Sequence, residues 1–331
     1  MSLTDFASIL RNLGTGDQFH PIVTLLGMGE PFMNQDLIPM LEHAKTHYPS
    51  LPLSLFTNFS LPTPEDLAAL VEIGVDEVIV SLECFDHDTY RRFRRGGEYE
   101  RVRRNIEILA EARRSSPSHK PACSMAFVLT KGTVPNMAAA IEFAATNGMY
   151  RVYFMCCYYL SCDTGSLMDF ESSDFREAFS EAVGLAGKAG VEVQFTGPRA
   201  YEYERCSTPF DFTYIAVDGA VFPCCFTMID PKLRSWEMGN LTTDSFDRIW
   251  NSDRFNELRR LVYSGGGMCG FCPIYFDGHK NVIIDLDFLR PASEAQARRS
   301  PVPAPQHSRP KTGVEDEAQN TDKQSRPEHQ H

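Results

Sequence analysis

The sequence has no excess of positive charge, no long apolar run and no export signal. Its 331 residues include 32 lysines and arginines against 44 acidic residues, a formal net charge of −12. This balance argues against a nucleic-acid backbone as partner, because phosphate binding needs basic surface. No run of about 18 apolar residues suggests a membrane span, and residues 1–5 lack the basic and apolar parts of a secretory signal. We therefore expect no nucleic-acid or membrane binding, and a cytoplasmic location.

The sequence also lacks a histidine-rich set of metal ligands. Its histidines are scattered, and we expect them on the surface rather than around a metal. This makes a zinc-dependent hydrolase on a barrel fold the weakest of the functions considered. The histidines weighed here are His20, His43, His47, His87 and His119.

Ten cysteines are present although no export signal precedes them. In the reducing cytosol such cysteines are free thiols or metal ligands rather than disulfides. Cys84 and Cys123 lie in apolar stretches, and we expect them to be buried as small hydrophobic residues. We expect burial also for Cys156, Cys157 and Cys162, on or just beyond a strand. The informative cysteines are those after residue 200.

Short apolar runs alternate with amphipathic stretches from Ile22 to about Gly190. This alternation is typical of repeated strand-helix units and predicts an α/β fold with a mainly parallel sheet. The strands are predicted at 22–26, 53–57, 77–82, 123–129 and 150–156.

Helices are predicted between these strands. The clearest begins after Thr63, an N-cap candidate followed by Pro64 and by Asp66 three residues on. Gly74 is placed to end it. Further helices are predicted at 98–114 and 174–188.

The pattern changes at 191–195, where short strands replace the strand-helix units, and we place the start of a smaller second unit there. Two apolar runs around Asp218-Gly219 predict a tight hairpin over 214–222. A helix is predicted over 245–262. Beyond about Arg290, apolar residues nearly vanish, which predicts a disordered tail. The predicted domains are therefore 1–190, 191–290 and 291–331.

Four cysteines of the second unit form a candidate metal centre. Cys269 and Cys272 stand on one tight turn, and three glycines at 265–267 let the backbone bend close to a ligand. The hairpin brings Cys206, before it, near Cys224 or Cys225, after it. Four thiolates suit zinc or an iron-sulfur cluster, and the spacing does not separate these two. The alternative is a set of buried thiols.

A glycine-rich turn follows the first predicted strand, at the edge where α/β sheets place their ligand sites. Its glycines let the backbone approach a ligand, and Glu30 offers an acceptor for an amine. A plain strand-to-helix loop is the alternative. Polar residues at the next two strand ends, Thr57-Asn58 and Ser81-Leu82-Glu83, favour a site. Burying Glu83 at a strand end is costly without a partner.

Together these residues closely resemble the radical S-adenosylmethionine (SAM) enzymes that carry a SPASM or twitch-type C-terminal extension. The resemblance runs from about Met1 to Lys280. In the first part, its motifs are Gly-Met-Gly-Glu-Pro at 27–31, Leu-Phe-Thr-Asn at 55–58, the run 74–83 that ends in Ser81-Leu82-Glu83, and Phe93-Arg94-Arg95-Gly96-Gly97. In the extension, the more specific part, they are 206–209, 218–225, 239–241, 249–251 and Cys269-x-x-Cys272.

The resemblance implies a partial βα barrel of the radical SAM type, followed by a small α+β extension with an auxiliary [4Fe-4S] cluster. Gly27, Gly29 and Glu30 would hold the amino group of SAM. Asn58 would line the same site, while Ser81 and Glu83 would lie near the SAM ribose. The cluster ligands would be Cys206, Cys224, Cys269 and Cys272.

The resemblance also implies a reaction. Members of this family cleave SAM reductively to a 5′-deoxyadenosyl radical, which takes a hydrogen atom from the substrate. Electrons would come from reduced ferredoxin or flavodoxin. Proteins with this extension often modify peptides or proteins, and some oxidise small alcohols, so the expected substrate is a peptide or a small polar molecule.

The sequence contains no Cys-x-x-x-Cys-x-x-Cys loop, on which the radical chemistry of the family depends, and the strand before that loop is missing too. Either the chain starts at an internal methionine of a longer protein, or it is a shortened homologue that lost the chemistry. We favour truncation, because the retained 27–31 turn would otherwise have no evident use. A second [4Fe-4S] cluster is then expected only if upstream residues exist. The competing function is a non-catalytic iron-sulfur or zinc protein that binds a partner through the extension.

Overall fold

The computed structural model describes residues 1–14, 21–27, 29–156, 169–170, 172–196, 208–229 and 235–263. The predicted tail at 291–331, together with Cys157, Cys162 and His20, lies outside these residues. Cys84, Cys123 and Cys156 are buried, as expected. No helix in the described ranges is both long and apolar enough to cross a membrane.

Six parallel strands form the main sheet, in the order in which they follow along the chain. Each strand pairs with the next, so the predicted α/β class with a parallel sheet is confirmed. The strands are β1 Val23–Leu25, β2 Leu53–Thr57, β3 Glu77–Ser81, β4 Ala122–Leu129, β5 Arg151–Cys156 and β6 Glu192–Thr196.

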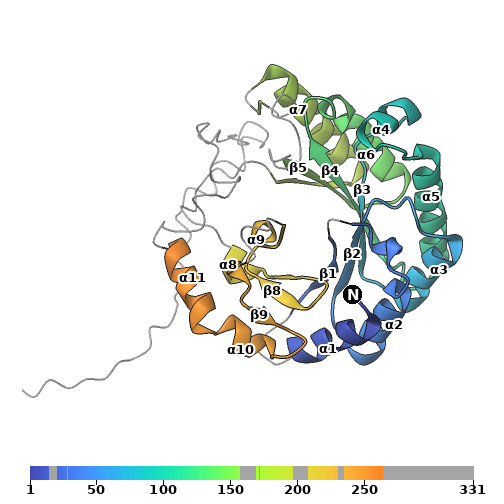
Figure 1. Cartoon of the computed structure of the whole chain (residues 1–331). Coiled ribbons are helices and arrows are strands. Elements are labelled where there is room, and N and C mark those ends of the chain that lie inside the picture. Colours follow the sequence, from blue (N-terminus) through green and yellow to red (C-terminus); the bar gives the residue numbers. More distant parts are fainter. Residues whose placement is uncertain are drawn as a thin grey trace, which may run out of the picture. The chain divides into compact units, whose positions relative to one another are not determined.

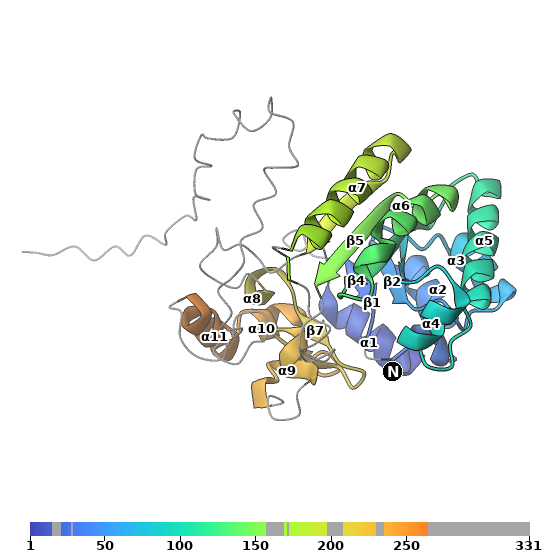
Figure 2. The same ribbon diagram turned by 90° about the horizontal axis from the view of Figure 1, so that it is seen from above.

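Helices connect these strands and lie outside the sheet (Figure 1). Turned by 90°, the same helices stay on one side of the strands (Figure 2). They are α1 Leu3–Leu13, η1 Pro31–Met33, α2 Leu37–His47, α3 Pro64–Ile73, α4 His87–Phe93, α5 Tyr99–Ser115, η2 Val134–Asn136, α6 Met137–Thr146 and α7 Ser173–Ala189.

Helix α3 forms as its sequence predicts. The Thr63 hydroxyl accepts a hydrogen bond from the Asp66 backbone N–H at 3.2 Å, and the Asp66 carboxylate accepts one from the Thr63 N–H at 2.8 Å. This reciprocal capping box satisfies two of the free donors at the helix start. Gly74 then ends the helix in the left-handed conformation, at φ 75°.

The two faces of the main sheet differ in polarity. Residues that pair across parallel strands share a face, and successive residues alternate between faces. One face carries buried apolar side chains and packs on the helices, as the contact of Phe154 with Phe179 of α7 shows. The opposite face carries polar side chains, including Glu77, Ser124, Arg151, Tyr153 and Glu192. This polar face is the one available to a ligand.

Strand β6 belongs to the main sheet, whereas the sequence placed residues 191–195 in a second unit. It pairs with β5 in parallel, with Arg151 opposite Glu192. Phe195 of β6 packs on Phe179 of α7 at 5.3 Å between ring centroids. The short apolar run had looked like the start of new strands, because nothing local reveals a parallel partner about 40 residues away. The domain boundaries themselves stay a prediction.

A small antiparallel sheet follows, in the order β7-β8-β9. The predicted hairpin is confirmed, with its turn at Asp218-Gly219 and Gly219 at φ 82°. The elements are α8 Thr208–Asp211, β7 Tyr214–Ile215, β8 Ala220–Phe222, α9 Cys225–Ile229 and β9 Gly239–Asn240.

The single helix predicted over 245–262 is wrong in one respect, because the chain forms two helices. They are α10 Phe246–Trp250 and α11 Asp253–Tyr263. Asn251 closes the first helix, and the Ser252 hydroxyl accepts a hydrogen bond from the Phe255 N–H at 3.2 Å, which caps the second. Asparagine and serine compete with the helix backbone for hydrogen bonds, and here they end one helix and start another.

Helix α1 packs against the small sheet and α11. Ile9 lies in one apolar cluster with Val221, Leu241 and Phe255. The Asn12 side chain donates a hydrogen bond to the Leu241 carbonyl at 2.7 Å. The first helix of the chain is therefore part of the core of the extension.

Candidate functional site

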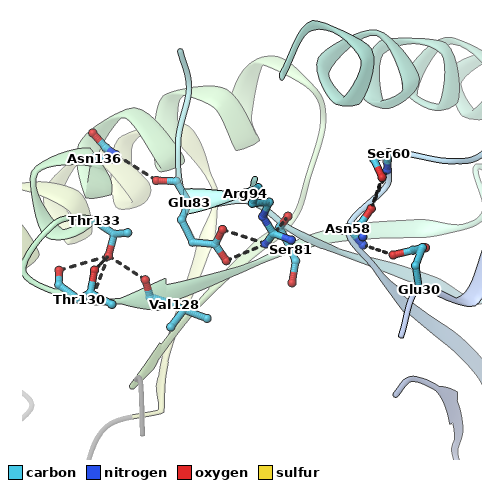
Figure 3. A network of polar contacts seen from close by, with 10 residues as sticks. All are labelled: Glu30, Asn58, Ser60, Ser81, Glu83, Arg94, Val128, Thr130, Thr133 and Asn136. Carbon is cyan, nitrogen blue, oxygen red and sulfur yellow. Dashed lines mark hydrogen bonds and ion pairs between the residues drawn. The ribbon is translucent and has the colours of Figure 1, made fainter. Parts of the chain in front are cut away.

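Polar side chains gather at the carboxyl ends of β1, β2 and β3, the edge where parallel sheets bind ligands. Figure 3 shows them in two groups, one around Glu30 and Asn58, the other around Glu83 and Arg94. Because neighbouring parallel strands end at the same edge, the turn and strand ends singled out in the sequence do converge.

The Glu30 carboxylate is fixed by the end of β2. The Thr57 hydroxyl donates a hydrogen bond to Oε1, and the Asn58 backbone N–H donates one to Oε2 at 2.8 Å. The Thr57 oxygen in turn accepts a hydrogen bond from the Phe59 N–H at 2.9 Å. Glu30 is half-buried and thus held at a fixed place on the edge.

The glycines before Glu30 lie open. Gly27 and Gly29 are exposed, and a Cβ at Gly29 would meet nothing within 4 Å. Their small size is therefore not demanded by packing among the described residues. It leaves space beside Glu30 for a ligand.

The Asn58 side chain is oriented by its own loop. Its Oδ1 accepts hydrogen bonds from the Ser60 N–H at 2.9 Å and from the Ser60 hydroxyl at 2.6 Å (Figure 3). With the acceptor occupied in this way, Asn58 presents its amide donors to the site.

Glu83 is buried and paired, with 8% of its surface exposed. Arg94 Nη2 donates to both of its carboxylate oxygens, at 3.1 and 2.9 Å, and lies 3.3 Å from the Ser81 carbonyl. Burial disfavours the charged guanidinium, but the Glu83 carboxylate outweighs burial and raises the pKa of Arg94. The Asn136 amide holds the Glu83 carbonyl at 3.0 Å.

This pairing gives Glu83 the partner that its position required. The sequence placed Arg94 in a family motif but gave it no role. The only available signal was the cost of burying Glu83 alone, and several arginines of α4 and its flank could have met it. Ser81 ends β3 on the polar face and is half-exposed, so its hydroxyl is open to a ligand.

Cys224 and Cys225 are the two candidate metal ligands that the structure describes. Both are half-buried thiols. The Cys224 thiol lies 3.7 Å from the Thr227 hydroxyl, which donates to the Cys224 carbonyl at 2.8 Å. Cys225 begins α9 beside the Tyr214 phenol; burial and the two thiols raise the pKa of Tyr214. Cys206, Cys269 and Cys272 lie outside the described residues.

A half-buried thiol at the end of a hairpin fits one ligand of a thiolate-bound cluster. The described residues alone hold no group of three potential metal ligands. In particular, His43 and His47 stack on α2, and His87 and His119 are exposed. This agrees with the expectation that the histidines are surface residues.

Sequence comparison identifies two families along the chain. Residues 1–144 match the Radical SAM superfamily, and residues 206–273 match SPASM, an iron-sulfur cluster-binding domain. The second match begins at Cys206 and includes all four predicted ligands. The two matches imply SAM and [4Fe-4S] clusters as cofactors.

Two curated relatives cover most of the chain. An AdoMet-dependent heme synthase of Methanosarcina barkeri is 25% identical, over 76% of this chain and 74% of its own. A tungsten-containing aldehyde ferredoxin oxidoreductase cofactor-modifying protein of Pyrococcus furiosus is 22% identical, over 78% of this chain and 75% of its own.

Solved structures share the fold. Streptococcus suis SuiB matches with a TM-score of 0.61 and 16% identity, over 78% of this chain. This chain spans 62% of the length of SuiB. The structure of anSMEcpe with bound AdoMet matches with a TM-score of 0.59 and 16% identity, over 78% of this chain and 71% of that protein. With the two family matches, these likenesses show that the chain belongs to the radical SAM superfamily and carries a SPASM iron-sulfur extension.

Proposed function

We propose that the chain binds SAM at the carboxyl edge of β1 to β3 and one [4Fe-4S] cluster on Cys206, Cys224, Cys269 and Cys272. It would serve a hydrogen-atom abstraction reaction on a peptide or small polar substrate, with reduced ferredoxin or flavodoxin as electron donor. The observation that carries this proposal is the Glu30 carboxylate, fixed by Thr57 and Asn58 beside open space.

Glu30 is suited to an ammonium group. An ionised carboxylate has about four acceptor positions, and Thr57 and Asn58 use two of them. The remaining positions can accept charge-assisted hydrogen bonds from the amino group of SAM. Gly27 and Gly29 would let the rest of the amino acid part approach the backbone.

Ser81 and Glu83 would serve the ribose side in different ways. The half-exposed Ser81 hydroxyl is free to contact a sugar hydroxyl. Glu83 is tied to Arg94, so its main effect would be to fix the end of β3 and hence the place of Ser81. Asn58 would present its amide donors between the two groups.

When bound, SAM and a reduced cluster supply the hydrogen-atom abstraction. The chain's own residues bind and orient. Glu30 holds an amine, Ser81 and Asn58 hold polar groups, and the polar face of the sheet meets the substrate.

Two substrate classes find support among the similar proteins. SuiB has been solved with its precursor peptide SuiA, with a TM-score of 0.61 to this chain, and anSMEcpe with the Cp18Cys peptide. The two curated relatives are instead named for heme synthesis and for modifying a cofactor. A peptide is the substrate class we place first, because the solved structures with peptides share the fold of both parts of the chain.

SAM binding tests the first half of the proposal. Equilibrium dialysis with labelled SAM would compare the anaerobically reconstituted chain with Glu30→Gln and with Glu72→Gln, an exposed glutamate of α3. Loss of one charged hydrogen bond should weaken binding about tenfold in the first variant and leave the control unchanged. Absence of SAM binding, or equal binding by both variants, would contradict the proposal.

Metal analysis tests the second half. One [4Fe-4S] cluster gives about four iron and four sulfide per chain, with a brown colour. A colourless chain holding zinc would contradict the cluster and favour the competing binding-protein function.

A further inference from the structure

Arg259 of α11 occupies an unusual place between two aromatic rings. Its guanidinium carbon lies 4.2 Å from the centroid of the Trp250 ring and 4.3 Å from that of Phe255. Such cation-π contacts are favourable, and more so when water is excluded. The flat guanidinium is therefore held in one orientation.

Its hydrogen bonds join separate parts of the extension. Nε donates to the Pro209 carbonyl of α8 at 3.0 Å. Nη1 donates to the Trp250 carbonyl at 2.7 Å and to the Asn256 side chain at 2.9 Å. A lysine could not make these bonds together, because it lacks the rigid fork of donors.

One donor of Arg259 is left over. Nη2 is buried and has no hydrogen-bond partner among the described residues. Burial also lowers the pKa of the guanidinium. An unused charged donor at a buried position is costly, which points to a partner that the described residues do not supply.

The segments that Arg259 joins all lead to cysteines. Helix α8 begins at Thr208, two residues after Cys206, and α11 ends at Tyr263, six residues before Cys269. Val221 of β8, just before Cys224, packs in the same apolar cluster as Phe255. Helices α8 and α11 are in contact, as Figures 1 and 2 also show.

We propose that Arg259 is a positioning residue for the iron-sulfur cluster: it ties the segment after Cys206 to the helix that leads to Cys269 and Cys272. This inference rests on the cluster half of the proposed function and not on SAM binding. Holding the segments together lowers the conformational entropy that cluster binding must remove. The spare Nη2 donor and its charge would favour the reduced cluster, since hydrogen bonds to sulfur and nearby charge set cluster potentials.

The experiment compares Arg259→Met, Arg259→Lys and Arg260→Met after anaerobic reconstitution. Met keeps the apolar stem, Lys keeps the charge, and Arg260 is the exposed neighbour on the same helix. Three quantities are measured: iron and sulfide per chain, the rate at which a chelator bleaches the cluster absorbance, and the cluster midpoint potential. Far-UV circular dichroism of the same samples reports whether the extension is folded.

Changes at contacts just outside the metal ligands commonly cost about ten- to a hundredfold in metal affinity. Arg259→Met should therefore lose its cluster to chelator faster by that order and show a lower midpoint potential. Arg259→Lys should bleach faster too, but keep a potential nearer that of the unaltered chain. Arg260→Met should match the unaltered chain.

The outcomes separate this inference from the proposed function. An unaltered chain without iron would remove the cluster itself, and the inference with it. An iron-loaded chain whose Arg259 variants bleach and titrate like Arg260→Met would overturn the inference alone. If Arg259→Met fails to fold, Arg259→Lys decides: a potential and bleaching rate equal to the control again overturn it.

Discussion

Arg94 Nη2 donates to both carboxylate oxygens of Glu83, at 3.1 and 2.9 Å, at the end of β3. The two side chains are 28% and 10% exposed, so water screens the pair only in part. Removing one partner of such a pair leaves the other charge buried and unpaired, which costs more than the pair gains in being formed.

Arg94→Met should therefore destabilise the chain by about 3 kcal/mol, measured by urea unfolding. Arg92→Met changes an exposed arginine of the same helix and should have little effect. Adding Glu83→Gln to Arg94→Met removes the stranded charge and should recover part of the loss. A double variant as unstable as Arg94→Met alone would contradict the buried-charge explanation.

Asp76 should give the stability of the barrel a dependence on acid. Burial alone would raise its pKa, but hydrogen bonds from Lys120, Lys45 and the Leu53 N–H outweigh burial and lower it. The last of these is 2.8 Å long. A carboxyl whose pKa is lower in the folded chain stabilises fully above its ordinary pKa of 3.8, and this contribution is lost as the pH falls through the folded value.

Asp76→Asn should thus cost about 2 kcal/mol near pH 7, and the difference from the unaltered chain should shrink below about pH 4. Urea unfolding of both chains between pH 3 and 7 measures this. Asp66→Asn, an exposed cap residue, serves as the control for a general loss of negative charge. A difference that stays constant down to pH 3 would rule out the ionised form as the source.

The sequence predicted the strands of the barrel well, because their patterns are local. Thr63, Pro64 and Gly74 mark one helix by backbone chemistry alone, and the structure confirms its ends. The glycine-rich turn and the strand ends were also found, since parallel strands must end at one edge. What local patterns cannot give is the partner of each group. The pairing of β6 with β5, of Glu83 with Arg94 and of Arg259 with Pro209 all join residues that packing alone brings together.

The choice between Cys224 and Cys225 can be tested directly. Cys224 stands between Pro223 and α9, with its thiol toward Thr227, whereas Cys225 opens α9 beside Tyr214. We expect Cys224→Ala to lose most of its iron and sulfide and Cys225→Ala to keep both, because a cluster needs each of its thiolates. Each variant is the control of the other. The reverse result would make Cys225 the ligand.

The hairpin turn at Gly219 links backbone conformation to the cluster. Gly219 has φ 82°, and a Cβ there would lie 2.6 Å from both the Asn240 Oδ1 and the Thr242 side chain. Gly184 offers the opposite case: it lies in α7, is exposed, and a Cβ would meet nothing within 4 Å. The same substitution should therefore have opposite effects at the two positions.

Gly184→Ala should stabilise the chain by about 0.5 to 1 kcal/mol, because alanine loses less entropy in a helix. Gly219→Ala should destabilise it by more than that, because alanine at positive φ is strained and the contacts to Asn240 and Thr242 cannot both relax. Urea unfolding measures both. Since β8 leads directly to Cys224, Gly219→Ala should also reduce the iron retained per chain, while Gly184→Ala should not. Equal iron in both variants would mean that the turn shapes the hairpin without placing the cysteine.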